Sequence, residues 1–222
     1  MTIDKLEKQI INCRKCSRLV EFREKIAFEK RKSYQDWDYW GKPVPGYGDV
    51  NKKIMILGLA PAAHGGNRTG RVFTGDKSAD FLFKCLHHVG LSNQSNSDHR
   101  NDGLQLSGYI TAAVKCVPPG DKPSSSEKEN CEPFLSKEFK MMSNLKIVLA
   151  LGKIGFDSCL RFVRKNHSIK MRDYKFGHGA KYLLPNGLIL IGSYHPSPRN
   201  VNTRKLTFEM MVSLLKKIKQ HI

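Results

Sequence analysis

The sequence predicts an α/β protein, a three-layer α/β/α sandwich around a mostly parallel sheet of four strands. Four short segments are apolar at consecutive positions, which is typical of strands buried on both faces. Segments with an apolar stripe at helical spacing lie between them, and strands that alternate with helices build parallel sheets. The 222 residues, 40% of them apolar, suit one domain spanning 1–222.

The expected elements follow in chain order. The predicted strands are residues 54–59, 109–114, 147–151 and 188–192. The predicted helices are residues 3–13, 19–26, 78–89, 127–142, 155–165 and 204–220. Ser78 is the expected N-cap of the third helix and Gly90 its end. Ligands of such folds bind beyond the carboxyl ends of the strands, so we expect the loops at 60–77 and 193–203 to meet at one edge of the sheet.

The chain is strongly basic. Its 38 Lys and Arg against 20 Asp and Glu leave a net charge of +18, which attracts polyanions such as nucleic acid. Basic surfaces also serve solubility or binding to anionic membranes. The sequence has no apolar stretch long enough to span a membrane, and residues 1–12 mix both charges, unlike a signal peptide. We therefore expect a cytoplasmic or nucleoid-associated protein whose thiols stay reduced.

Four of the six cysteines suggest a metal centre. Cys13 and Cys16 form a CxxC pair, and Cys116 and Cys131 each stand beside a turn signal. Four thiolates from distant segments can hold a zinc ion or a [4Fe–4S] cluster. Zinc sites more often use two CxxC pairs, so the spacing favours the cluster, with zinc and unrelated thiols as alternatives.

Two loops carry the most informative motifs. The Gly-rich loop (residues 60–77) contains most of the motif GLAPAAHGGNRTGRVFTGD, where small residues let backbone amides approach a ligand closely. It lacks the GxxxxGK[ST] pattern of a P-loop, and alone it could be a tight connection. The HPSPRN loop (residues 193–203) follows the last predicted strand. The two motifs together are far more specific than either one.

On these motifs the sequence resembles the uracil-DNA glycosylase superfamily, most closely its iron–sulfur branch, family 5 or B type. The likeness covers nearly the whole chain, in the family's order: CxxC, the Gly-rich motif, YITAAVKCVPPGDKP, the fourth cysteine and HPSPRN. It implies a monomeric enzyme that flips uracil out of double-stranded DNA, with single-stranded DNA as an alternative substrate. It hydrolyses the glycosidic bond and so initiates base excision repair. It implies a [4Fe–4S] cluster that ties the N-terminal segment to the core through Cys13, Cys16, Cys116 and Cys131.

The resemblance also implies roles for individual residues. His195 matches the histidine that donates to O2 of the departing uracil, as an oxyanion hole does. Phe73 matches the aromatic residue on which the flipped base stacks; a structural histidine and a core phenylalanine are the alternatives. The implied base-binding residues are Gly58, Ala60, His64, Asn67, Phe73 and Ala112. The implied DNA-binding residues are Arg68, Arg71, Ser197, Arg199 and Asn200.

The chain departs from other branches of the superfamily at three places. Residues 58–62 offer no polar side chain to position the attacking water, a lack that family 5 shares. Asp76 is the candidate substitute, and its alternative role is to cap the helix that starts near Ser78. Where family 4 has Asn in YITNVVKC this chain has Ala112, so the pocket should be less selective and also accept hypoxanthine or 5-substituted uracils.

The HPSPRN loop departs as well. Arg199 stands where other branches present an apolar wedge, so it either fills the gap left by the flipped base or contacts phosphate. Arg204 stands where the family often has Gly.

Two rival functions remain: a non-catalytic iron–sulfur nucleic-acid-binding protein, and a zinc-stabilised hydrolase, for which the sequence has no GxSxG motif.

Overall fold

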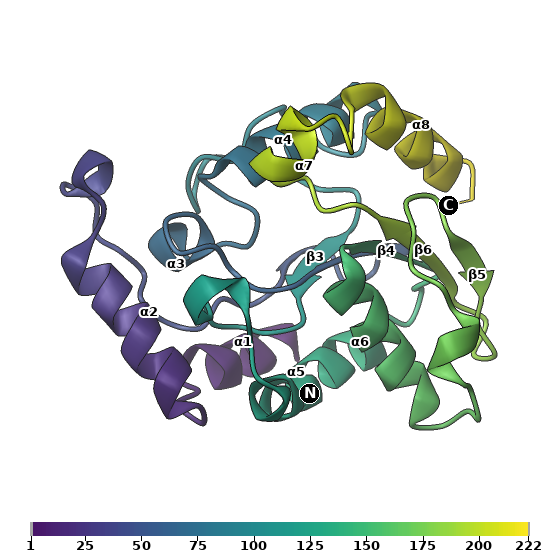
Figure 1. Ribbon diagram of the computed structural model, residues 1–222, viewed down its shortest axis with the longest axis horizontal. Coiled ribbons are helices and arrows are strands. Elements are labelled where there is room, and N and C mark those ends of the chain that lie inside the picture. The colour runs from purple at the N-terminus through teal and green to yellow at the C-terminus, as the bar shows by residue number, and fades with distance from the viewer. Residues whose placement is uncertain (1, 222) are drawn as a thin grey trace.

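The computed structural model describes residues 2–221 and has the predicted three layers (Figure 1). Its strands are β1 (Tyr47–Gly48), β2 (Ile54–Gly58), β3 (Tyr109–Ala112), β4 (Ile147–Leu151), β5 (Lys181–Leu183) and β6 (Ile189–Ser193). Its α-helices are α1 (Ile3–Ile11), α2 (Ser17–Glu29), α3 (Gly66–Thr69), α4 (Lys77–His88), α5 (Ser125–Met141), α6 (Lys153–Arg164), α7 (Pro198–Asn202) and α8 (Phe208–Lys219). Three 3₁₀ turns join them: η1 (Lys32–Tyr34), η2 (Pro119–Asp121) and η3 (Met171–Asp173).

The sheet within the described residues has six strands in the order β1-β3-β2-β4-β6-β5, not the four predicted. The inner four are parallel and are the predicted ones. The outer two, β1 and β5, are antiparallel to their neighbours. They are two and three residues long, too short for a hydrophobic period to show in the sequence.

Helices cover both faces of the sheet because successive strand residues point to opposite sides. Ile54 and Ile56 of β2 pack under α4 and α8, whereas Met55 and Leu57 pack against α5 and α6. Figure 1 shows α4 and α8 on one side of the sheet and α5 and α6 on the other, with α2 running along the left edge. In residues 2–221 no helix is both long and apolar enough for a membrane span.

Two predicted helix boundaries are wrong. Asp76, not Ser78, is the N-cap of α4, and its carboxylate accepts hydrogen bonds from the amides of Ser78 and Ala79. The helix expected over 204–220 begins only at Phe208, as α8 with Thr207 as its N-cap, and α7 is a separate short helix that precedes it. Arg204 lies between them with a φ of 56°, a conformation that a continuing helix cannot contain.

Candidate active site and cysteine cluster

The two predicted loops meet at the carboxyl edge of the parallel strands, as expected. The Gly-rich loop leaves β2 and the HPSPRN loop leaves β6. Their closest aromatic contact is between the rings of Phe73 and His195, whose centroids are 6.0 Å apart with planes inclined by 34°. Residues 122 positions apart in the sequence thus form one wall of a site.

The backbone beneath this wall explains the glycine at the end of β2. Phe73 has a φ of 47°, and its ring lies on Gly58. A Cβ at residue 58 would come within 2.8 Å of two ring carbons. Phe73 is partly exposed and not a fully buried core residue. The turn therefore holds an aromatic face at the edge of the sheet, where a planar base could stack.

His195 is held by its own loop. Asn200 donates from Nδ2 to the carbonyl oxygen of His195 at 2.8 Å, and Ser197 caps α7 by accepting from the amide of Asn200. Burial lowers the pKa of His195, so the ring is neutral near pH 7 and can still donate one N–H. Ser197 and Asn200, two of the residues predicted to bind DNA, thus form hydrogen bonds within their own loop. Arg199, in contrast, is exposed.

Asp76 combines two features. Its Oδ1 accepts from the amides of Ser78 and Ala79 at 2.9 and 3.0 Å, which is the capping role. Its Oδ2 lies against Gly65, where a Cβ would be only 2.1 Å away. Burial raises the pKa of this carboxyl group, and the two amide bonds oppose the rise. Both capping hydrogen bonds go to Oδ1, so they fix the carboxylate and leave Oδ2 free of the cap.

A cleft of about 630 Å³ lies beside Asp76. His64 lines it, and Nδ1 of His64 is 3.0 Å from the hydroxyl of Tyr39. Burial, followed by the charges of Arg31 and Arg68, lowers the pKa of His64. The opposite wall comes from the aromatic segment after α2, including Tyr34 and Trp37. The sequence showed this concentration of aromatic residues but not where it would fold.

Arg68 and Arg71 are not the surface residues that a DNA-binding role predicts. Arg68 is 3% exposed and lies between the rings of Tyr34 and Trp37, with its Cζ 3.9 and 4.0 Å from their centroids. It donates to the carbonyl oxygens of His64 and Gly75. Among the described residues its Nη1 is buried and has no hydrogen-bond partner.

Arg71, predicted to contact DNA, is engaged inside the protein. Its side chain is 2% exposed and forms two hydrogen bonds to Asp102, at 2.6 and 2.8 Å. Burial opposes the ionisation of Asp102, but the hydrogen bonds from Arg71 and from two backbone amides lower its pKa to about 2. Arg71 therefore fastens the Gly-rich loop to residues 97–102.

Three predicted base-binding residues also have internal positions. Asn67 is 1% exposed and donates from Nδ2 to the carbonyl oxygen of Arg23 at 3.1 Å. Ala112 is 1% exposed and belongs to the core under α4 and α8. Ala60 packs beside the cysteines. The structure therefore gives these residues supporting contacts, and Ala60, His64 and Phe73 are the predicted base-binding residues that are partly exposed.

The four predicted metal ligands come together. Cys13 follows α1, Cys16 caps α2, Cys116 follows β3 and Cys131 lies in α5, and all four line one small hollow. Burial raises the pKa of Cys116, and it raises that of Cys131 to about 12. Across residues 2–221, no three His, Cys, Asp or Glu side chains converge on a point where a single metal ion could sit.

Arg23 provides the test of whether these thiols suit a charged group. It is 2% exposed and lines the same hollow. Its Nη1 donates to Sγ of Cys116 at 3.0 Å and to the carbonyl oxygen of Cys13 at 3.2 Å. Its Nε has no partner among the described residues. Four thiols around a buried cation fit an anionic metal–thiolate group.

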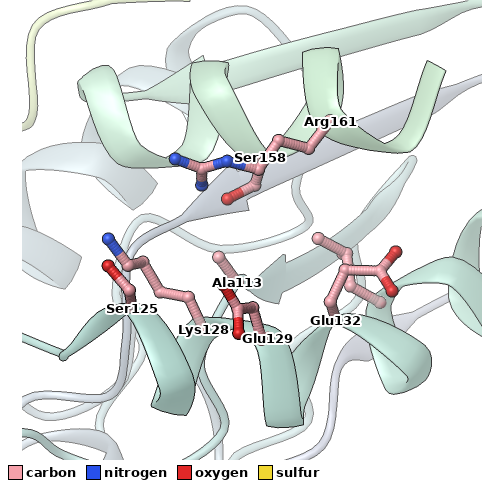
Figure 2. Close-up of a pocket in the computed structure, with 8 residues that line it drawn as sticks. Ala113, Ser125, Lys128, Glu129, Glu132, Ser158 and Arg161 are labelled. Carbon is pink, nitrogen blue, oxygen red and sulfur yellow. The ribbon is translucent and has the colours of Figure 1, made fainter. Parts of the chain in front are cut away.

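A further pocket, of about 120 Å³, lies between α5 and α6. Figure 2 shows Ser125 and Lys128 of α5 opposite Ser158 and Arg161 of α6. None of the predicted site residues lines it. It is therefore separate from the site formed by Phe73 and His195.

Comparisons with known proteins identify the family of this chain. The family model described as the uracil DNA glycosylase superfamily matches residues 45–219. The type-5 uracil-DNA glycosylase of Mycobacterium bovis is 42% identical over 221 residues, covering 99% of this chain and 81% of the relative. That of Thermus thermophilus is 42% identical over 209 residues, covering 94% and 93%. The type-4 uracil-DNA glycosylase of Pyrobaculum aerophilum is 28% identical over 176 residues, covering 79% and 72%. The chain therefore belongs to the uracil-DNA glycosylase superfamily, and its likeness over nearly its full length places it in the type-5 family.

Proposed function

We propose that this protein is a DNA glycosylase that hydrolyses the bond between uracil and deoxyribose. The observation that carries the proposal is the pairing of Phe73 with His195, an aromatic face and a neutral N–H donor, across two loops. The printed names of the type-5 relatives support the same activity. We infer that the chain acts as a single-domain monomer on the DNA of the nucleoid, where excision starts base excision repair.

The proposed reaction needs three kinds of help from the chain. The flipped uracil stacks on Phe73. As the C1′–N1 bond breaks, its electron pair moves onto the base, and the N–H of His195 donates to O2, where the negative charge gathers. Water then adds at C1′, and the proton that it loses passes through solvent to the uracil anion, so the products are free uracil and an abasic sugar.

Asp76 is the proposed group that orients this water. Its free oxygen, Oδ2, lies on the floor of the cleft beside Gly65. The carboxylate is fixed by the amides at the start of α4, so it loses no freedom when it binds water. Burial raises the pKa of Asp76, and only the charged carboxylate orients water, so this help should increase as the pH rises through that pKa.

We also propose a broad range of excised bases. Near the end of β3 the chain has Ala112, which offers no side-chain hydrogen bond to discriminate among bases. Hypoxanthine and 5-substituted uracils are the expected additional substrates. Duplex DNA is the proposed main substrate, and single-stranded DNA a second one.

Cys13, Cys16, Cys116 and Cys131 are the proposed ligands of a [4Fe–4S] cluster. When bound, the cluster crosslinks α1, α2 and α5 to the end of β3 and can exchange single electrons. The four thiols around one hollow and the unpartnered N–H of Arg23 support this assignment. Anaerobically purified protein should be brown and contain about four irons per chain. About one zinc and no iron would contradict it.

Release of free uracil from a labelled duplex tests the enzymatic proposal. The wild type should release uracil, and the Cys116→Ser variant should lose iron, solubility and folding rather than chemistry alone. Tight DNA binding with an intact cluster and no base release would instead favour a non-catalytic nucleic-acid-binding protein.

A further inference from the structure

Arg23 carries a buried charge that the protein alone does not balance. Its side chain is 2% exposed, and its nearest carboxylate oxygen, on Glu24, is 3.8 Å from Nη2. Glu24 is itself 45% exposed and is bound by both terminal nitrogens of Arg14. A buried guanidinium without a close partner is unfavourable. Its balancing charge must therefore come from the hollow that it lines.

The position of this charge is fixed from both ends. Nη1 of Arg23 donates to the carbonyl oxygen of Cys13 and to Sγ of Cys116. The carbonyl oxygen of Arg23 accepts from Asn67 of the Gly-rich loop. The guanidinium is thus held against the thiols by its own hydrogen bonds, and the backbone of Arg23 is held by the Gly-rich loop.

The other buried cation beside the hollow is already neutralised. Lys115 lines the hollow too, but its Nζ is 2.7 Å from Oε2 of Glu138, and both side chains are fully buried. Thr111 and Tyr109 complete the hydrogen bonds of that carboxylate. Lys15 also lines the hollow but is exposed to solvent, so Arg23 is the buried cation whose charge is left for the thiol group.

We infer that Arg23 is a positioning residue that sets the reduction potential of the cluster. This inference rests on the proposed [4Fe–4S] centre. Four thiolates around such a cluster make it anionic, and adding one electron makes it more so. A buried positive charge and N–H donors to sulfur stabilise the more negative, reduced form. Arg23 therefore raises the potential.

The test is protein-film voltammetry, with the electron supplied by the electrode, beside iron analysis of each variant. Arg23→Gln should keep about four irons per chain and show a potential lower than the wild type. Arg14→Gln is the matched control, because Arg14 follows Cys13 directly but is 63% exposed and bonds to Glu24 rather than to sulfur. Its potential should stay near that of the wild type, since solvent screens its charge.

Several results would overturn the inference. One is Arg23→Gln with full iron content and an unchanged potential; another is a shift in potential no larger than that of Arg14→Gln.

If Arg23→Gln fails to fold, the Arg23→Lys variant tests the inference instead. It keeps the charge but not the forked donors, so its potential should be lower and the deuterium-sensitive Fe–S vibrations of the wild type should change. An Arg23→Lys protein identical to the wild type in both measurements also contradicts it. A wild type without iron would instead contradict the proposed cofactor, on which the inference depends.

Discussion

Phe73 has an unfavourable backbone conformation, and its ring fits only because residue 58 is a glycine. Its left-handed φ of 47° is unfavourable for an aromatic residue, and such strain is often found at functional sites. The ring gains contact with His195 and lies where a side chain at position 58 would otherwise be. The glycine at the end of β2 is thus part of the site, because it makes room for the aromatic face.

Gly58→Ala should displace this ring. A Cβ at 2.8 Å from two ring carbons must push Phe73 from its place, and misplacement of a positioned group by about 1 Å can cost up to about 100-fold in rate. We expect uracil excision to slow by about 10-fold or more, measured by single-turnover kinetics. Gly177→Ala is the control, because its Cβ would make an ordinary 3.9 Å contact. Equal rates for the two variants would contradict the stacking role of Phe73.

At the scale of elements, the sequence predicted the inner sheet because each strand is a run of apolar residues. It failed for β1 and β5, whose few residues are half exposed or exposed. The four cysteines could be predicted to form one cluster because the motifs that contain them follow the order of a known family. The aromatic partners of Arg68 and the carboxylate partner of Arg71 could not be predicted, because they lie in other segments that only the folded chain brings near. A basic residue in a motif looks the same whether it meets phosphate or a buried carboxylate.

Arg71→Met tests the internal role directly. Removing one partner of a buried ion pair leaves Asp102 unpaired, which typically costs about 3–5 kcal/mol. We expect the free energy of unfolding to fall by about this amount, measured by urea denaturation. The salt dependence of DNA binding should not change. A stable variant whose DNA affinity has a weaker salt dependence would instead support the predicted DNA contact of Arg71.

At the scale of the whole molecule, the net charge of +18 is held mainly by exposed side chains. The buried cations are engaged inside: Arg71 with Asp102, Lys115 with Glu138 and Arg23 with the cysteines. The charge available to DNA therefore lies on the surface, including Arg199 of the HPSPRN loop.

DNA affinity should fall steeply with salt, because each phosphate contact releases counterions. Arg199→Glu should weaken binding and reduce the log–log salt slope by about 1 if Arg199 contacts a phosphate. Arg172→Glu is the control, since Arg172 is 80% exposed and lies in η3. The measurement is fluorescence anisotropy over a salt series. Affinity that hardly changes with salt would mean that the charge serves something other than DNA.

The relative cost of losing His195 and Asp76 tests the central claim most directly. With no polar side chain at residues 58–62 to hold water, most of the catalytic help should go to the departing base. Single-turnover excision of uracil by His195→Ala should therefore be slower than by Asp76→Ala by about 10-fold or more, as for the loss of an oxyanion-type donor. On hypoxanthine the order can differ, because a purine leaves through other ring atoms. An equal or smaller loss for His195→Ala on uracil would place the main catalytic group on the Gly-rich loop instead.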